Sequence, residues 1–285
     1  VYGIGAYNHS GTDISITAEQ TTGGVHAIHA HQYGGTGTTR ITTNGVTTGG
    51  SGSGIHTDSP TGQAVEITLN DSSDVSATSG NAIVDTDADA SVTVYTGASV
   101  TGSIALGGGV DTLTFAGGDF SGVTSFDGGD GASDILSFGG SGGALDSTII
   151  SNWERVEITA GSTISFSNNL LAVNTLSIGT GGIFDATSGT FTLTGNLINT
   201  GTLRLADGDV SDVVNVSGNF AGGGTISMDV NTAAQTSDTL DIAGDASGTT
   251  QIAFTNTTPT IGSDNTIANV VTVQGTSSAT NFSGS

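Results

Sequence analysis

The feature that most constrains this chain is an internal repeat. Gly195-Asn196-Leu197 opens a segment that returns 23 residues later as Gly218-Asn219-Phe220, and both copies continue through Gly-Thr-apolar-x-apolar. A second phrase, Ser-Asp followed by alternating apolar residues, occurs at Asp212 and again 26 residues later at Asp238. Self-similarity with a period of 20–50 residues is typical of stacked repeat architectures. The repeat therefore favours a solenoid over a single compact globule.

The N-terminal part, residues 1–105, carries the repeat in a looser form. Short alternating apolar stretches are centred on Ile16, Ile41, Ile67 and Val94, at spacings of 25, 26 and 27 residues. In a coil of stacked strands, residues one period apart occupy the same position on successive turns. We therefore expect these four side chains to form one inward-facing column.

The apolar residues are arranged as strands and turns. Although the chain has 47 glycines among 285 residues, its Val, Ile, Leu and Phe residues alternate in short runs bounded by Gly, Asn, Asp and Ser. Alternation with turn residues at both ends predicts β-strands, and patterns with a helical period are nearly missing. The predicted fold class is all-β: a parallel β-helix, or β-solenoid, with about 23–27 residues per turn.

The aspartate phrase extends the period through the middle of the chain. It occurs at Asp111 and at Asp134, 23 residues apart, and Asp212 follows 78 residues later, which is three periods of 26. No segment between them has the composition of a linker. We expect one continuous solenoid, and we interpret the chain as a piece of a longer protein because it starts and stops inside repeat-like sequence.

The net charge excludes several classes of partner. The formal charge is −23, and the chain has only 3 basic residues, all arginine. Such a surface repels nucleic acid and anionic lipid, both of which need Lys and Arg to neutralise phosphates.

The chain has no cysteine, so disulfides and thiolate metal sites are excluded. No apolar run approaches the ~18 residues of a membrane span, and we expect no direct membrane insertion.

Four motifs carry a resemblance to a known family. In chain order they are Asp-Thr-Leu-x-Phe at 111–115, Asn-Trp-Glu-x-Val at 152–156, Gly-Asn-Leu-x-Asn-x-Gly-Thr-Leu at 195–203 and Gly-Asn-Phe-x-Gly-Gly-Gly-Thr-Ile at 218–226. Together they resemble the passenger region of bacterial autotransporters, the proteins of type V secretion.

The resemblance is most specific in the C-terminal half. From about Trp153 to Phe282 the chain is similar to the pertactin-like end of such a passenger, including its autochaperone segment. The stretch 267–275 with Phe282 resembles the strand pair that closes it. The resemblance implies two parts of one solenoid: N-terminal β-helix repeats over 1–152 and a pertactin-like end over 153–285.

The family also implies a fold, a location and a partner. The fold would be a right-handed parallel β-helix, and the chain would be extracellular or on the bacterial cell surface. Export across the outer membrane would use the protein's own C-terminal β-barrel, which lies outside this sequence. Residues 1–152 share only the general repeat pattern of the family. The resemblance therefore implies no receptor or substrate specificity for them.

The histidines form one group in the sequence. His26, His29 and His31 are close together, and His9 and His56 lie about one repeat away on either side. In a strand, His29 and His31 would share a face and could pair at a metal ion. No acidic residue lies close to them in the sequence. A strand of the solenoid whose imidazoles face solvent explains the pattern equally well. We favour the strand with solvent-facing histidines and predict that these histidines bind no metal.

A second candidate site is rich in aspartate and glycine. Asp111, Asp119, Asp127, Asp130 and Asp134 lie among glycines, in a manner similar to the nonapeptides that bind calcium in β-rolls. The nine-residue period is not sustained, however, and Asp and Gly are also common turn residues. Asp111, Asp130 and Asp134 are the candidates for calcium; we otherwise predict that the chain binds no metal.

A third pattern bears on catalysis. Asp85, Asp87 and Asp89 alternate, which predicts three carboxylates on one strand face. Paired carboxylates could hydrolyse glycosides, but a lyase acting on an acidic polysaccharide would also need basic residues. A solvated acidic edge that blocks strand pairing is the favoured interpretation. We find no catalytic triad, phosphate loop or cofactor motif, and we predict no catalytic residues and no cofactor.

These observations lead to an expected function. We expect a secreted or surface-displayed passenger that acts by contact, as an adhesin or virulence factor that binds a host cell-surface protein or glycan, and not as an enzyme. The alternative is a passenger that degrades polysaccharide, as a lyase or glycoside hydrolase. Specificity is expected in segments that interrupt the repeats, namely Gln20–Gly23, His31–Thr39 and Thr48–Gly54.

Overall fold

The computed structural model describes residues 2–258, 267, 269–278 and 280–284. Its elements are β-strands apart from one short 3₁₀ helix, η1 (Ser147–Ile149). The prediction of an all-β parallel solenoid is therefore confirmed. The chain divides into two compact units, residues 1–141 with 148–154, and residues 142–147 with 155–285. The predicted boundary at residue 153 stays a prediction.

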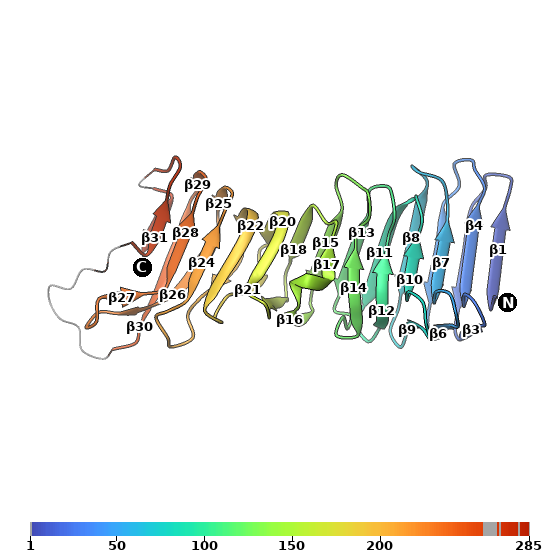
Figure 1. Cartoon of the computed structure of the whole chain (residues 1–285), viewed down its shortest axis with the longest axis horizontal. Helices are drawn as coiled ribbons and strands as arrows, with labels where there is room; N and C mark the ends of the chain where they lie inside the picture. Colours follow the sequence, from blue (N-terminus) through green and yellow to red (C-terminus); the bar gives the residue numbers. More distant parts are fainter. Residues whose placement is uncertain (1, 259–266, 268, 279, 285) are drawn as a thin grey trace. The chain divides into compact units, whose positions relative to one another are not determined.

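The first unit is a coil with three faces, and successive turns lie side by side within it (Figure 1). The first face contains β1 (Ile4–Asn8), β4 (Ile28–Gln32), β7 (Ile55–Asp58), β10 (Ile83–Asp85), the end of β12 (Ser99–Ala105), β14 (Val123–Asp127) and β17 (Ile150–Ser151). The second contains β2 (Ile14–Ala18), β5 (Thr39–Thr43), β8 (Ala64–Leu69), β11 (Asp89–Tyr95), β13 (Thr112–Ala116) and β15 (Ile135–Gly139). The third contains β3 (Thr21–Gly23), β6 (Val46–Gly49), β9 (Asp74–Ala77) and the start of β12. All these pairings are parallel.

The second unit repeats this plan. One sheet contains β16 (Gly142–Leu145), β19 (Thr163–Phe166), β21 (Ile183–Asp185), β23 (Thr202–Arg204), β26 (Thr225–Asn231), β30 (Thr250–Asn256) and β32 (Phe282–Gly284). Another contains β18 (Arg155–Ile158), β20 (Leu170–Ile178), β22 (Thr190–Asn199), β24 (Val213–Val216), β28 (Thr239–Ile242) and β31 (Val271–Val273). The end of β22 pairs with β25 (Phe220–Gly222), which pairs with β29 (Ala246–Gly248), and β27 (Thr236–Ser237) pairs antiparallel with β26.

The strand register reproduces the near-copies in the sequence. Leu197 lies opposite Phe220 and Leu203 lies opposite Ile226, both at the predicted offset of 23 residues. All four side chains are buried. Parallel strands in register stack equal positions on one another, so each turn buries its aliphatic residues against the turns beside it.

The predicted inward column is correct at three positions and wrong at the fourth. Ile16, Ile41 and Ile67 are buried and in register. The column continues at Val92, whereas Val94 lies opposite Leu69, two residues further along the strand. Both valines of β11 point inward because side chains alternate in a strand. Spacing alone could not tell which of them continues the column.

The segments that were expected to interrupt the repeats are only partly strands, and residues 50–54 of Thr48–Gly54 lie between β6 and β7. Thr21–Gly23 is β3, and Thr21 and Thr47 are buried on the third face. The inward positions of β3 and β6 hold threonine and glycine, whereas Val75 and Val100 continue the same column on β9 and β12, so the first strands of this face lack the aliphatic pattern. His31–Thr39 also overlaps β4 and β5, so only residues 33–38 lie between strands.

The closing strands appear where the sequence placed them. β31 pairs with β28, and β32 pairs with β30. Ala268, which belongs to the predicted closing stretch, lies outside the described residues.

Candidate functional site

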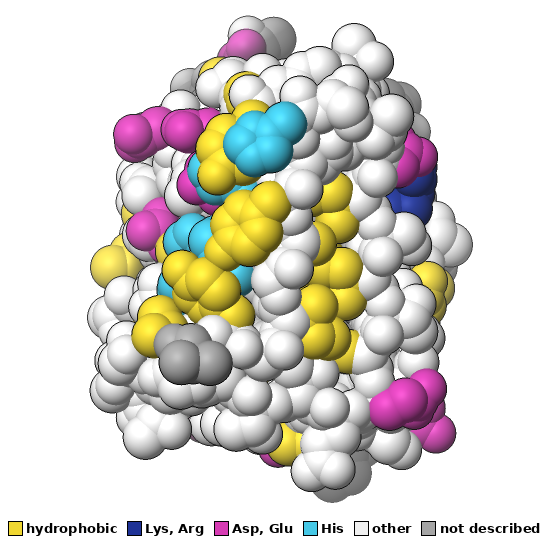
Figure 2. Space-filling model, turned by 90° about the vertical axis from the view of Figure 1, so that its right-hand side faces the viewer, with side chains coloured by type: hydrophobic (Ala, Val, Ile, Leu, Met, Phe, Trp, Pro, Cys, Tyr) yellow, Lys and Arg dark blue, Asp and Glu magenta, His cyan; other side chains and the backbone are white. Residues whose placement is uncertain are grey.

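The first face of the N-terminal unit carries a histidine–tyrosine surface. We define it by residues from β1, β4, β7 and adjoining turns: Tyr2, Tyr7, His9, His26, His29, His31, Tyr33, His56 and Asp58. Strand register creates this surface, since Tyr7 lies opposite His31, His31 opposite Asp58, and His29 opposite His56. Figure 2 shows histidines lying among side chains coloured hydrophobic, the class that includes tyrosine.

The rings of this surface stack in a row. Tyr33 lies between His9 and His31, with ring centroids 3.8 Å apart on both sides and nearly parallel planes. Tyr2 and Tyr7 approach His29 edge-on, with centroids 4.8 and 5.4 Å away. The edge-on approach of the two tyrosines is a favoured geometry for aromatic rings. The packing holds the imidazoles in fixed positions.

Hydrogen bonds fix the ring nitrogens further. The Tyr7 hydroxyl and the Nδ1 atom of His29 are 3.1 Å apart. The backbone amide of Ser53 donates to Nδ1 of His26 at 2.8 Å, and Nδ1 of His31 lies 2.8 Å from Oδ2 of Asp58. The Nε2 atom of His29 is buried and has no hydrogen-bond partner.

The expectation of solvent-facing histidines is wrong for His29, whose residue is only 9% exposed. Burial lowers the pKa of His29, and the nearby His26 and His31 lower it further. Burial, together with His26 and His29, lowers the pKa of His56 to about 4. These imidazoles are therefore neutral near neutral pH.

The histidines are evident in the sequence, but Asp58 is not evident as their neighbour. The nearest acid does not lie in the same segment and comes from the next turn. The signal was present in the sequence, because His56-Thr57-Asp58 follows His29-Ala30-His31 by 27 residues, one period of the coil.

Two of the calcium candidates belong to a buried acid ladder. The backbone amide of Ala90 donates to Oδ1 of Asp111 at 2.7 Å, and the amide of Asp111 donates to Oδ1 of Asp134 at 2.8 Å. The amide of Asp134 in turn donates to Oε2 of Glu154 at 2.8 Å. Each carboxylate thus accepts a hydrogen bond from a backbone amide of the preceding turn, at or just before the start of a strand. Burial raises the pKa of Asp111 to about 8 and also raises that of Asp134.

The third calcium candidate lies apart from this ladder. Asp130 is exposed, whereas Asp111 and Asp134 are fully buried. Among the described residues, three potential metal-binding side chains converge only at His29, His31 and Asp58. The calcium assignment therefore stays a hypothesis without support from the geometry.

The three alternating aspartates do not share a face, which corrects the sequence-based expectation. β10 ends at Asp85 and β11 starts at Asp89, so the chain turns a corner between them. Asp85 is buried and accepts hydrogen bonds from the Thr57 hydroxyl and the Ala88 amide, and its burial raises its pKa to about 7. Asp87 is exposed.

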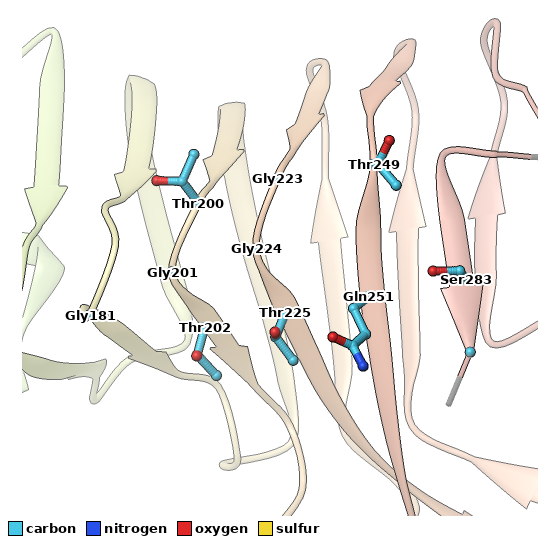
Figure 3. A pocket seen from close by; sticks show the side chains of 11 residues that line it. Gly181, Thr200, Gly201, Thr202, Gly223, Gly224, Thr225, Thr249, Gln251 and Ser283 are labelled. Carbon is cyan, nitrogen blue, oxygen red and sulfur yellow. The ribbon is translucent and has the colours of Figure 1, made fainter.

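The C-terminal unit has an open polar groove of about 470 Å³ on its outer surface (Figure 3). Its lining includes Thr200, Thr202, Thr225, Gln251 and Ser283 with intervening glycines, and contains no acidic or basic side chain. Such a surface can donate and accept hydrogen bonds but has no group for acid–base chemistry.

The three arginines of the chain are all engaged by carboxylates. Arg40 bridges Asp13 and Glu66 from the turns on either side. Arg155 pairs with Glu157, and Arg204 with Asp185. Arg40 and Arg204 thereby link successive turns, whereas Arg155 and Glu157 both lie on β18.

Comparison with known families identifies the C-terminal segment. Residues 207–285 match the family model described as Pertactin. Apart from the antiparallel β27, the described strands of the matched segment pair in parallel, as the strands of the first unit do. This chain fits a pertactin-like autotransporter passenger. Among curated proteins, none matches the chain.

The matched segment contains the carboxylates of a second acid ladder. The amide of Gly189 donates to Oδ1 of Asp212 at 2.7 Å, and the amide of Asp212 donates to Oδ1 of Asp238 at 3.1 Å. The family implies secretion to the cell surface. Within the described residues, no helix is long and apolar enough to span a membrane.

Proposed function

We propose that this passenger acts by contact at the bacterial surface, as an adhesin or virulence factor that binds a host cell-surface protein or glycan. The observation that carries the proposal is the histidine–tyrosine surface. Tyr2, Tyr7 and Tyr33 are 41%, 46% and 50% exposed and lie close together on this surface. Exposed tyrosines on a rigid support contribute large contact area at low entropic cost and are enriched at binding hot spots.

The position of this surface on the fold supports the same function. Part of the surface, including Tyr7 and His31, lies on paired strands, which keep it in place, while Tyr33 belongs to segment 33–38 between β4 and β5. Specificity usually varies in such connecting segments while the strands stay constant. Of the expected specificity segment 31–39, only residues 33–38 lie outside strands. We therefore propose that the sequence of 33–38 can vary without loss of β4 or β5.

Charge limits the partner. With a formal charge of −23, the fragment should be repelled by DNA, heparin and acidic phospholipid at physiological salt. A neutral glycan or a neutral or basic protein surface is the compatible target. Export by the protein's own C-terminal outer-membrane β-barrel is part of the same proposal.

Cell and glycan binding test this function. Labelled fragment is titrated onto mammalian cells and onto a glycan panel, beside the double variant Tyr7→Ala/Tyr33→Ala. We expect the double variant to lose roughly tenfold or more in affinity, as for paired aromatic hot-spot residues. Tyr95→Ala is the matched control, because Tyr95 is also 46% exposed but lies on β11, on the second face. Equal binding by all three proteins, or equal loss in the control, would refute the proposed contact surface.

We further propose that the passenger is not an enzyme. The polysaccharide-degrading alternative requires a cleft with at least two acids and a free basic group. The groove of Figure 3 has neither among its lining residues, and the three arginines are paired. Release of reducing ends or unsaturated products from polysaccharides by the intact fragment would overturn this proposal.

A further inference from the structure

We propose that His29, His31 and Asp58 form a binding site for a divalent transition-metal ion of the zinc type. One potential ligand atom from each residue lies within 4.8 Å of the other two. This site is independent of the contact function proposed above and would stand without it.

Strand geometry brings the ligands together. His29 and His31 are two residues apart on β4 and therefore point to the same face. Asp58 lies on β7 directly opposite His31. Neighbouring parallel strands are about 4.8 Å apart, so the three side chains stand at adjacent corners of a small array. His56, opposite His29, occupies the remaining corner.

The environment of His29 is suited to metal binding. Its Nε2 atom is buried without a hydrogen-bond partner, and the residue as a whole is only 9% exposed. Nδ1 contacts the Tyr7 hydroxyl at 3.1 Å. A ligating histidine typically uses its other nitrogen in such a hydrogen bond, which fixes the ring orientation. A cation would satisfy the nitrogen that the protein itself leaves unpaired.

His31 and Asp58 already form a close pair. Nδ1 of His31 lies 2.8 Å from Oδ2 of Asp58, and Oδ1 of Asp58 accepts a hydrogen bond from the Thr86 hydroxyl at 3.2 Å. A metal ion would replace the proton that the pair shares. The contact to Thr86 would continue to orient the carboxylate.

The ligand set selects the class of metal. Two imidazoles and one carboxylate suit zinc and neighbouring transition metals, whereas calcium and magnesium prefer oxygen ligands. Zinc bonds of about 2.0–2.1 Å place tetrahedral ligand atoms roughly 3.3 Å apart. The ligand atoms now lie within 4.8 Å of one another, so the side chains would rotate toward the ion on binding, and the fourth position would be taken by water or His56.

Calorimetry with zinc chloride tests the proposal directly. The fragment is first stripped with a chelator and then titrated near neutral pH in a buffer that does not bind metal. We expect one saturable zinc site per chain and no comparable binding of calcium. His29→Gln, His31→Gln and Asp58→Asn should each weaken binding roughly tenfold or more, as loss of a ligand does. His9→Gln should bind like the parent, because His9 belongs to the same surface but not to the ligand group.

A spectroscopic readout keeps the test independent of folding defects. Circular dichroism first establishes that each variant retains the β signal. Zinc should then shift the imidazole proton resonances of His29 and His31 in the parent protein and leave that of His9 in place. No saturable binding, equal weakening by His9→Gln, or shifts spread over all five histidines would each overturn the site.

Discussion

The backbone amide of Asp111 donates a 2.8 Å hydrogen bond to the buried carboxylate of Asp134, one turn further along the chain. The two aspartates occupy equal positions, since Thr112 and Ile135, the residues that follow them, are paired in register. A buried amide at the entrance to a strand needs an acceptor. The next turn supplies it with an aspartate side chain.

Removal of one ladder carboxylate should destabilise the protein. Asp134→Ala leaves the Asp111 amide buried without its acceptor, which should lower the free energy of unfolding by about 1–3 kcal/mol. Asp130→Ala is the control, because Asp130 is exposed in the same turn region. Urea unfolding followed by circular dichroism measures both. A similar change for the two variants would contradict the structural role of the ladder.

Stability should fall as pH rises from mildly acidic to mildly basic. Burial raises the pKa of Asp111 to about 8 and that of Asp238 to about 6 from an ordinary value of 3.8. The folded state therefore keeps these protons to higher pH than the unfolded chain does. Their contribution is complete below the unfolded pKa and is lost as pH passes the folded pKa. Urea unfolding between about pH 5 and about pH 8 should show a loss on the order of a few kcal/mol.

The variant Asp111→Asn identifies the source of that pH dependence. An asparagine can still accept the Ala90 amide but cannot ionise. We expect its unfolding free energy to vary less with pH than that of the parent. An unchanged pH profile would place the effect elsewhere.

A charge placed in the inward ladder of the C-terminal unit should disrupt folding. Leu203 is fully buried opposite Ile226 and Phe184. Leu203→Asp would bury a carboxylate without a partner and should cost roughly 3–5 kcal/mol or more. Thr202→Asp, at the outward-facing neighbour, adds the same charge and should cost far less. Soluble yield and thermal melting compare them, and equal losses would contradict the inward column.

Glycine is required where two turns approach closely. Gly129 has φ +89°, and a Cβ there would lie 1.6 Å from the carbonyl oxygen of Gly107. Gly62 has a similar φ of +80° but open space around it. Gly62→Ala should cost only the left-handed strain of about 1–2 kcal/mol, whereas Gly129→Ala should cost clearly more because the backbone must move. Thermal melting distinguishes the two; matching shifts would argue against the close approach.

The sequence predicts the solenoid well because every turn repeats the pattern. The 23-residue offset predicted that Leu197 and Phe220 would occupy equal positions on successive turns, and the two residues are indeed paired in register. The third face escaped detection because Thr21 and Thr47 fill buried positions that usually hold aliphatic residues. The acid phrase at Asp111 and Asp134 was visible, but its role depends on a backbone amide in another turn, which no local pattern shows.

The histidine site shows the same limit. His29 and His31 were noticed as a pair on one strand face. Their acidic neighbour, Asp58, is a whole turn away in sequence, and only the strand register brings it beside His31. Burial of His29 depends on Tyr2 and Tyr7, which come from the preceding turn.

The acid ladder makes the turns of this protein interchangeable. The carboxylate of Asp134 accepts a hydrogen bond from the Asp111 amide, and the carboxylate of Glu154 accepts one from the Asp134 amide in the same way. If residues 112–134 were excised, Asp111 would directly precede Ile135 and could take the place of Asp134 beside Glu154. Ile104 and Ile150, each now paired with Phe126, would face one another on the first face. Evolution can thus shorten or lengthen such a coil by whole turns, since each new junction meets the same donor and acceptor as the one it replaces.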